Sequence, residues 1–409
     1  MLTEVERLKE IIRLDNELST VQDLDLLLER ILTEARKITN ADAGSIYIRE
    51  DDHLVFSYAQ NDTMQRKLPP GQKLIYLTFK MKITTGSIAG YVASTGKTLN
   101  IPDVYKIPQD APYKFDSSYD KVSKYKTQSM LTVPLKNATG EVIGVLQIIN
   151  KKNHDGEVIP FDGEDEVICL HFASTASMAL QRAQLTRALI LRMIAMAELR
   201  DPKETGAHVN RVAGYATEIY ECWAKKHGLS REEINKKRDI LRMAAMLHDV
   251  GKVAISDVIL KKPGKLTKRE REIMKTHTYL GARLFIQKQS EFDEIASQVA
   301  LRHHENWDGT GYPGHIDVLT GKPIKKGPDG KPLPLKGEEI PLFGRIVSIA
   351  DVFDALQSKR AYKKAWEEDR VLKEMKSLSG TKFDPELVDA FFETYNVIKS
   401  ITARYPDTD

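Results

Sequence analysis

The sequence predicts a multidomain protein in which an α+β domain, built on an antiparallel sheet flanked by helices, is joined by a long helix to an all-α domain. Three observations support this fold class. Short β-rich runs bounded by turn residues fill most of the first 150 residues, a helical pattern then runs without interruption to about residue 198, and most of the chain beyond residue 200 keeps a helical period. A chain of 409 residues is also too long for a single core. We expect four parts: an N-terminal helix (1–18), a sensor-type domain (19–162), a connector helix (163–198) and a second domain (199–409).

Composition and charge narrow the classes of function. Lys and Arg total 61 against 58 Asp and Glu, which gives a net charge of +3 and argues against binding to a nucleic acid polymer or to a membrane. Cys169 and Cys222 are too few for a disulfide framework and fit a reducing compartment. The opening "MLTEVERLKEIIRLDNEL" lacks the apolar segment of a signal peptide, and no window is apolar enough to span a bilayer. We therefore expect a cytoplasmic protein.

The first domain begins with a predicted helix over 19–40, where Ser, Thr and Asp start signals precede a helical apolar period. A second, shorter helix over 86–97 should stop at Gly96. The turn "NATG" at 137–140 predicts a hairpin between the last two of five strands. The predicted strands are 44–50, 53–59, 98–103, 129–136 and 141–151.

The connector is predicted because the helical pattern continues far beyond the usual length of a globular helix, with no Pro and one early Gly. The alternative is a core helix followed by a second helix whose boundary the sequence does not show. The connector is favoured because the helix keeps its apolar positions beyond the point where the pattern of the sensor-type domain ends.

Five of the histidines after residue 200 fall in mostly apolar helical segments, and two acids accompany them. A lone His on such a helix is usually a hydrogen-bonded core residue, and Glu204 has an ordinary surface acid as its alternative. Buried imidazoles and carboxylates are costly without partners, so several of them should converge, and a cation satisfies them together. Such a set without cysteine suits Fe, Mn or Zn and fits a catalytic site better than a structural zinc site. The residues concerned are Glu204, His208, His248, His277, His303, His304 and Asp351.

Three motifs carry a resemblance to a known family. "HDVGK" (248–252), "HHENWDGTGYP" (303–313) and "ADVFDALQSKRAYKKAW" (350–366) occur in this order. Together they resemble the HD-GYP family of metal-dependent phosphodiesterases, a branch of the HD superfamily. The resemblance covers roughly residues 195–395, and three linked motifs make it specific.

The resemblance implies a cluster of two or three divalent ions, with Fe or Mn as the expected metals. Asp249 would bridge two ions, and Glu204 corresponds to a residue that recruits a third ion in some members. The first ion would be held by His208, His248, Asp249 and Asp351, and the second by Asp249, His277, His303 and His304.

The same resemblance implies a reaction and a set of substrate contacts. The family's usual substrate is cyclic di-GMP, which is cleaved to pGpG and sometimes onward to GMP. Asp249 would orient the attacking hydroxide, and a two-metal site supplies such a nucleophile near neutral pH. The residues expected to contact substrate also have alternative roles. The Lys and Arg side chains could simply be solvated, Tyr312 could be a packed aromatic, and Asp308 could brace its loop. The expected contacts are Lys252, Asp308, Gly311, Tyr312, Arg360 and Lys363.

Two other functions remain open for the second domain. It could be an HD hydrolase that acts on another nucleotide, or a catalytically silent receptor that binds a ligand. The intact "GTGYP" loop favours cyclic di-GMP, and no metal ligand is lost, which disfavours the receptor.

One segment departs from the family pattern. Residues 315–336 intervene between the Gly-Tyr-Pro motif and "GEEIP". Asp329-Gly330 between two Lys-Pro arms predicts a hairpin. The segment could be a lid or an electrostatic guide to the site, or a tolerated surface insertion.

The first domain resembles a GAF domain through "DAGSIYI", "GSIAGYVASTGK", "SMLTVPL" and "GVLQIINK". Asn150-Lys151 with Phe161 and Asp165-Glu166 resembles a signature of cyclic-nucleotide-binding GAF domains, which we expect to brace the fold. The resemblance implies a possible small-molecule ligand. The pocket-forming stretch has no cysteine, which disfavours a covalent bilin.

We also expect a homodimer that forms through the helices at both ends of the first domain. This expectation rests on the spacing of apolar residues in the N-terminal helix and in the connector. The seam would contain Val5, Leu8, Ile12, Leu185 and Leu189.

Overall fold

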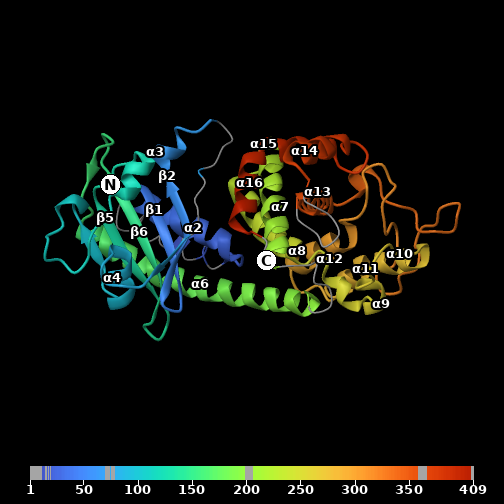
Figure 1. The fold of residues 1–409 in the computed structure, drawn as a ribbon, viewed down its shortest axis with the longest axis horizontal. Helices are drawn as coiled ribbons and strands as arrows, with labels where there is room; N and C mark the ends of the chain where they lie inside the picture. Colours follow the sequence, from blue (N-terminus) through green and yellow to red (C-terminus); the bar gives the residue numbers. More distant parts are fainter. Residues whose placement is uncertain are drawn as a thin grey trace. The chain divides into compact units, whose positions relative to one another are not determined.

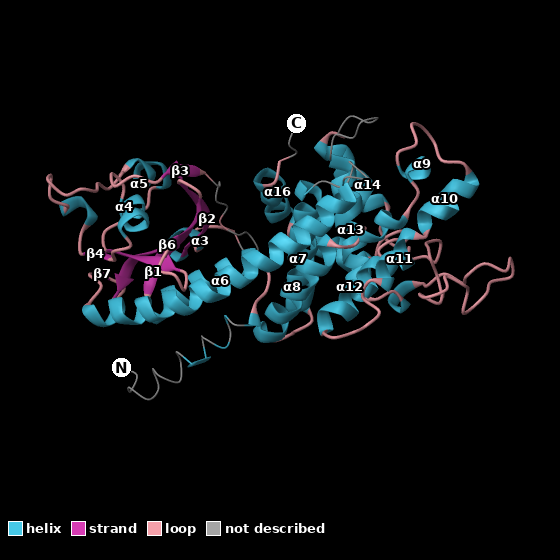
Figure 2. Ribbon diagram, turned by 90° about the horizontal axis from the view of Figure 1, so that it is seen from below, coloured by secondary structure: helices cyan, strands magenta, loops and turns pink. Residues whose placement is uncertain are grey.

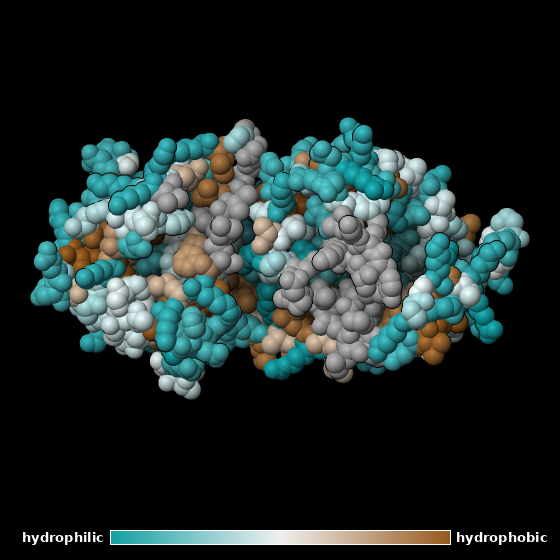
Figure 3. Space-filling view, viewed as in Figure 1, coloured by the Kyte–Doolittle hydropathy of each residue, from teal (hydrophilic) through white to brown (hydrophobic). Residues whose placement is uncertain are grey.

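The structure is a computed structural model that describes residues 20–69, 79–198, 206–357 and 366–406, together with residues 12, 13, 16, 18 and 74. It divides the chain into two compact units, Met1–Arg187 and Ala188–Asp409. Most of the N-terminal helix expected over 1–18, including Val5 and Leu8, lies outside the described residues. On the face drawn in Figure 3, most of the described surface is hydrophilic.

The first unit is built on a seven-stranded sheet in which all neighbouring strands are antiparallel. The order is β3-β2-β1-β6-β5-β4, and β7 pairs with β6 (Figure 1). The predicted antiparallel α+β fold is thus confirmed. The strands are β1 Ala41–Glu50, β2 His53–Asn61, β3 Lys80–Lys82, β4 Leu99–Ile101, β5 Met130–Lys136, β6 Val142–Lys152 and β7 Val158–Ile159.

Helices cover both faces of this sheet (Figure 2). Alternate residues of β1, β5 and β6, such as Ile46, Val133 and Leu146, form one core with α2 and the first part of α6. On the opposite face, α4 packs over β5 and β6 through Ala89 and Val92. The helices of this unit are α2 Leu24–Ile38, α3 Asp62–Gln65, α4 Ile88–Thr95, the 3-10 turn η1 Val104–Lys106, α5 Ser118–Ser123 and α6 Gly163–Glu198.

Local capping signals set the ends of these helices. Asp23 caps α2 through Leu26 N, and Ser87 caps α4 through Gly90 N. α4 then ends at Gly96, whose φ of 64° a glycine adopts without strain. The hairpin predicted at 137–140 joins β5 to β6 and is closed by a bond from Asn137 N to Glu141 O.

The signature residues of the first unit brace the end of β6. Lys151 Nζ lies 2.8 Å from Asp162 Oδ2 and 2.5 Å from Asp165 Oδ2, at the start of α6. Asn150, with φ of 56°, accepts from Gln128 N and donates to Tyr125 Oη. These bonds tie the sheet to the following helix, which agrees with the bracing role expected from the sequence.

α6 is a single helix of 36 residues. Cys169, Phe172 and Ala183 of its earlier turns are buried in the core of the first unit. Ile190 and Ile194 of its last turns are buried in the core of the second unit. At a rise of about 1.5 Å per residue, a helix of this length extends roughly 54 Å. Among the described residues, no helix is long and apolar enough to cross a membrane.

The described part of the second unit consists of helices, 3-10 turns and loops. Its core lies mainly between α7, α8, α12, α13 and α15. Capping boxes begin α8 at Ser230, α10 at Thr267 and α12 at Ser290. The elements are α7 Gly206–Lys226, α8 Arg231–Met246, η2 Val250–Ala254, α9 Asp257–Leu260, α10 Lys268–Lys275, α11 His277–Arg283, α12 Glu291–Arg302, η3 Gly337–Glu339, α13 Leu342–Gln357, α14 Glu368–Ser377, α15 Pro385–Glu393 and α16 Tyr395–Arg404.

Candidate metal centre

The end of α8 places His248 and Asp249 beside the core. α8 stops at Met246, and the chain turns through these two residues into η2. His248 is fully buried, and its Nδ1 lies 2.8 Å from the carbonyl oxygen of Ala245. A carbonyl can only accept, so Nδ1 carries the proton and Nε2 presents its lone pair.

Gly251 allows η2 to approach α11 closely. A Cβ at this position would lie 1.9 Å from His277 O and 2.4 Å from Gly281 N, which no side chain could tolerate. The glycine of the "HDVGK" motif therefore serves packing. Its consequence is that His277, the first residue of α11, lies next to Asp249, with 3.1 Å between His277 Nε2 and Asp249 Oδ1.

His277 and His303 use the same local support as His248. His277 Nδ1 donates to Met274 O at 2.7 Å. His303, at the end of α12, donates from Nδ1 to Val299 O at 3.0 Å. Both rings are buried, so their Nε2 atoms are fixed in direction toward the centre.

The fourth supported ring, His208 on α7, is held by a carboxylate. Its Nδ1 lies 2.8 Å from Asp354 Oδ2 on α13. Asp354 also accepts from Arg211 Nε at 2.6 Å and from Arg211 Nη2 at 2.8 Å. Burial raises the pKa of the Asp354 carboxyl, but the bonds from Arg211 and His208 outweigh it and lower the pKa to about 2. A permanently ionised Asp354 thus orients His208, which is a common support for metal-binding histidines.

The side chains gather into two groups that meet at Asp249. In each group, one ligand atom per residue lies within 4.8 Å of the others. The two groups are Asp249, His277, His303 and His304, and His208, His248 and Asp351.

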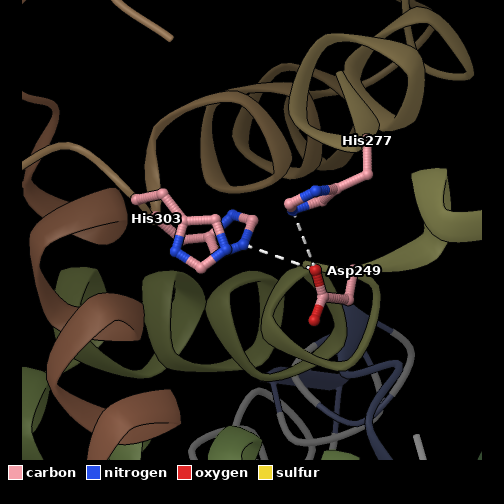
Figure 4. A group of neighbouring side chains, drawn as sticks. Asp249, His277 and His303 are labelled. Carbon is pink, nitrogen blue, oxygen red and sulfur yellow. Dashed lines mark ion pairs between the residues drawn. The ribbon is translucent and has the colours of Figure 1, made fainter. Parts of the chain in front are cut away.

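The Asp249 carboxylate has one oxygen toward each group. Oδ1 lies 3.1 Å from His277 Nε2 and 3.5 Å from His303 Nε2 (Figure 4). Oδ2 lies 3.4 Å from His248 Nε2, which belongs to the second group. This is the arrangement that a carboxylate shared by two cations requires.

Several buried atoms here have no hydrogen bond within the described part of the chain. They are Asp249 Oδ1, His277 Nε2 and His303 Nε2. Leaving such atoms without a partner is costly in a buried site, and a divalent cation would satisfy all three. The imidazole and carboxylate donors therefore fit a metal ion of the kind that N,O sites hold.

The protonation states also suit metal binding. Burial raises the pKa of the Asp249 carboxyl, but the charges of Lys252, His248 and His277 outweigh it and hold the pKa well below its usual range. Burial lowers the pKa of His303, and burial together with the neighbouring His303 lowers that of His304 further. The carboxylate is thus ionised and these rings are neutral, the forms that bind cations.

The structure describes four of the six residues expected to contact substrate: Lys252, Asp308, Gly311 and Tyr312. Lys252 Nζ lies 2.7 Å from Asp249 Oδ2, at the edge of the centre. The Tyr312 ring lies over His304 with 4.9 Å between centroids, and Lys275 Nζ lies 5.3 Å from the Tyr312 centroid. Burial raises the pKa of the Tyr312 hydroxyl, which therefore stays protonated. Glu204, Arg360 and Lys363 lie outside the described residues.

The loop that carries Tyr312 depends on close backbone packing. At Gly311 a Cβ would lie 2.2 Å from Asn306 N, so only glycine fits. Asp308 Oδ1 accepts from Thr310 N at 2.9 Å and from Thr310 Oγ1 at 2.7 Å. The contacts of Asp308 are those of a loop brace, the alternative role that the sequence left open for it.

Two supporting acids lie within the sequence motifs. Asp354 belongs to the motif at 350–366 and lies one turn after Asp351 on α13, and Glu305 belongs to the motif at 303–313 and was expected to support the histidines. Glu305 is buried and accepts from Gly314 N at 2.7 Å and from Arg302 Nη1 at 3.1 Å. It therefore fastens the loop after α12.

The insertion over 315–336 forms a paired arm, as the Asp329-Gly330 turn predicted. Gly327 N donates to Lys331 O at 2.9 Å, and Gly330 has a φ of 75°. The arm packs at its base against α11, where Arg283 Nε donates to Val318 O at 2.7 Å. Leu319 and Ile324 remain more than half exposed.

Comparison with known protein families assigns both units to classes. Residues 23–180 match the GAF domain family, and residues 205–356 match the HD domain family. A further HD domain family matches residues 326–387. The chain therefore carries a GAF domain followed by an HD domain that contains the HD-GYP motifs. HD domains bind divalent metal ions, and the centre at Asp249 is the candidate site.

Curated relatives match about half of this chain. A 3'3'-cGAMP-specific phosphodiesterase 2 from Vibrio cholerae is 37% identical over 55% of this chain and 38% of its own length. The cyclic di-GMP phosphodiesterase response regulator RpfG from Xanthomonas campestris is 40% identical over 54% of this chain and 50% of its own length. A cyclic di-GMP phosphodiesterase from Thermotoga maritima is 38% identical over 54% of this chain and 52% of its own length. The chain thus spans about half the length of these relatives or less.

Proposed function

We propose that the protein is a metal-dependent phosphodiesterase that hydrolyses cyclic di-GMP to pGpG, GMP or both, under the control of its GAF domain. The observation that carries this proposal is the Asp249 carboxylate, whose two oxygens face different groups of histidines. The relatives named as cyclic di-GMP phosphodiesterases support the choice of substrate.

The proposed cofactors are two divalent ions, Fe or Mn, which Asp249 would help to hold. Carboxylate and neutral imidazole donors without thiolate suit these metals. Such a pair of ions supplies a nucleophilic hydroxide and neutralises charge on the phosphate. Glu204 would add a third ion. The other proposed ligands are His208, His248, His277, His303, His304 and Asp351.

In this proposed mechanism, each side chain near the substrate would have a role that agrees with its contacts. Asp249 would orient the attacking water, because its carboxylate stays ionised. Lys252 would stabilise negative charge that develops on the phosphoryl oxygens, and the protonated Tyr312 hydroxyl would donate to one of them. Arg360 and Lys363 remain proposed phosphate contacts, and Gly311 and Asp308 would shape the loop beneath Tyr312.

A product analysis tests the proposal. The protein is purified without oxygen, loaded with Mn²⁺ or Fe²⁺, and incubated separately with cyclic di-GMP and with 3'3'-cGAMP. We expect pGpG or GMP from cyclic di-GMP. Turnover of 3'3'-cGAMP alone would favour the alternative substrate that one relative's name suggests. Bound metal with no turnover of either would favour a silent receptor.

We further propose that the protein acts in the cytoplasm as a homodimer that pairs through α6. Its cysteines, Cys169 and Cys222, are free, as expected in a reducing compartment. Exposed apolar residues follow one side of α6 at helical spacing, opposite the side that enters the cores. They are Val167, Leu170, Met178, Leu185, Leu189, Met193 and Met196.

A further inference from the structure

Lys382 lies in a turn that is fastened to the histidine loop. The turn connects α14 to α15, and Gly380 N donates to Phe383 O at 2.9 Å within it. Trp307 N donates to Lys382 O at 3.1 Å, and Asp308 N donates to Thr381 O at 2.8 Å. These backbone bonds hold the turn against the loop that follows His304 without using the Lys382 side chain.

Lys382 is half-buried, and its ammonium group makes only a long hydrogen bond to a neutral acceptor. Its Nζ lies 3.3 Å from Asn306 Oδ1, and no acid among the described residues pairs with it. Asn306 is turned toward Lys382 because its own Nδ2 donates to Thr310 Oγ1 at 2.9 Å. Burying an ammonium opposite a single neutral acceptor is unfavourable, so an anion is expected to complete the site.

The Lys382 side chain lies close to the Asp249 group, because its partner Asn306 follows His304 by two residues. Burial lowers the pKa of the Lys382 ammonium, while the charges of Asp351 and Asp308 oppose the shift. Lys382 therefore lies within electrostatic reach of the place where a phosphate would be attacked.

We propose that Lys382 is a substrate-binding residue that donates from Nζ to a phosphate oxygen of a nucleotide phosphodiester held at the metal centre. The proposal rests on the proposed function and deepens it by assigning a phosphate contact outside the three sequence motifs. Asn306 is the positioning residue, because it directs the ammonium. A purely structural role for the side chain is disfavoured, because the backbone bonds of the turn already hold the loop.

The test compares neutral and charged replacements in the full-length, metal-loaded protein. Lys382→Met keeps the apolar stem, Lys382→Gln keeps a polar tip that can reach Asn306, and Lys382→Arg keeps the charge. Lys373→Met, at an exposed position on α14, is the matched control. Titration calorimetry with inorganic phosphate and with pGpG measures binding, and elemental analysis measures bound metal.

We expect both neutral variants to bind each probe about 10- to 100-fold more weakly, since a charge-assisted bond is lost. Lys382→Arg should stay within about threefold of the original affinity, and the Lys373→Met control should match the original protein. Metal content should not change in any variant. The affinity of the original protein should also fall more steeply with salt than that of Lys382→Met.

Two results would overturn the inference: unchanged phosphate binding in both neutral variants, or a loss of bound metal that accounts for the weaker binding. Failure of the proposed function would look different. If the original protein cleaves no cyclic dinucleotide but its phosphate binding still depends on Lys382, the activity is wrong and the phosphate contact stands.

Discussion

Asp249 is the residue on which both histidine groups depend, because each of its oxygens faces a different group. Asp249→Asn keeps the size of the side chain and removes its charge. We expect bound metal to fall to one ion or none and turnover to fall by at least about 100-fold. Loss of a residue that binds the metal directly should reduce activity more than loss of a residue that only orients a ligand. Elemental analysis and initial rates with cyclic di-GMP measure these effects.

The control for this change is Asp257→Asn, which makes the same substitution at an exposed position on α9. It should leave metal content and turnover unchanged. Full metal loading in Asp249→Asn would contradict the shared-carboxylate arrangement.

Asp354 supports the centre without facing a metal. Asp354→Asn should weaken metal binding by about 10- to 100-fold, because His208 loses the carboxylate that fixes its ring. It should also lower the free energy of unfolding by roughly 3 kcal/mol, because the buried Arg211 loses its charged partner.

Metal titrations and urea unfolding at neutral pH check the Asp354 prediction, with the exposed Asp389→Asn on α15 as control. An Asp354→Asn variant that is less stable but binds metal normally would show that Asp354 serves the fold alone.

At this scale the three sequence motifs contain part of the proposed centre, whereas His208 and His277 lie outside them. His248, Asp249 and His303 stand within these motifs. The sequence does not predict Lys382, which reaches the site through a turn about 75 residues after the histidine loop. Contacts of this kind depend on tertiary packing, so the spacing of residues in the sequence does not predict them.

At the scale of elements, the approach of η2 to α11 determines whether Asp249 and His277 meet. Gly251→Ala would place a Cβ 1.9 Å from His277 O and force the two elements apart. We expect a loss of about 1–3 kcal/mol in unfolding free energy, as for other overpacked sites, together with reduced metal binding.

Thermal unfolding and elemental analysis measure the effect of Gly251→Ala. Gly206→Ala is the control, since a Cβ there meets no atom of the described residues within 4 Å. If Gly251→Ala retained full stability and metal content, the close approach would not be needed.

A buried network at the start of β1 makes the first unit sensitive to acid. Asp42 Oδ2 accepts from Tyr125 Oη at 2.9 Å, and Asp42 Oδ1 accepts from Lys152 Nζ at 2.5 Å. Burial raises the pKa of Asp42, but the bonds from Lys152, Thr63 and Tyr125 outweigh it and lower the pKa below its usual value. Its stabilising effect is therefore present above the unfolded pKa of about 3.9 and is lost as the pH falls through the lower folded pKa.

In Asp42→Asn the free energy of unfolding should accordingly decrease less steeply with falling pH below about pH 4. Calorimetric unfolding of the original protein, Asp42→Asn and the exposed control Asp155→Asn between pH 3 and 6 measures the slopes. Parallel slopes for all three would remove Asp42 as the acid-sensitive group.

The five strands predicted from the sequence correspond to β1, β2, β4, β5 and β6. β3 and β7, which have three and two residues, were missed, whereas the equally short β4 was predicted as part of the run 98–103. The pairing of β3 with β2 and of β7 with β6 depends on tertiary context.

At the scale of the whole molecule, the exposed apolar side of α6 predicts self-association. Leu185→Glu with Leu189→Glu should convert the proposed dimer to a monomer, because charges would replace two apolar side chains that are 59% and 51% exposed in a single chain. Sedimentation analysis over a range of concentrations measures the mass.

Leu319→Glu with Ile324→Glu, which changes exposed apolar residues in the insertion, is the control and should leave the mass unchanged. An original protein that sediments as a monomer at all concentrations would exclude the dimer.

The supports of His248, His277 and His303 have a consequence for how an ion enters. Each Nδ1 is anchored to a carbonyl three or four residues earlier, so the direction of Nε2 is set within one turn of chain. The chain's own hydrogen bonds therefore orient these donor atoms, unlike the ligands of small zinc domains that fold around their metal. Selection among competing ions would then follow from ionic radius and preferred coordination number, since these donors have little freedom to adapt.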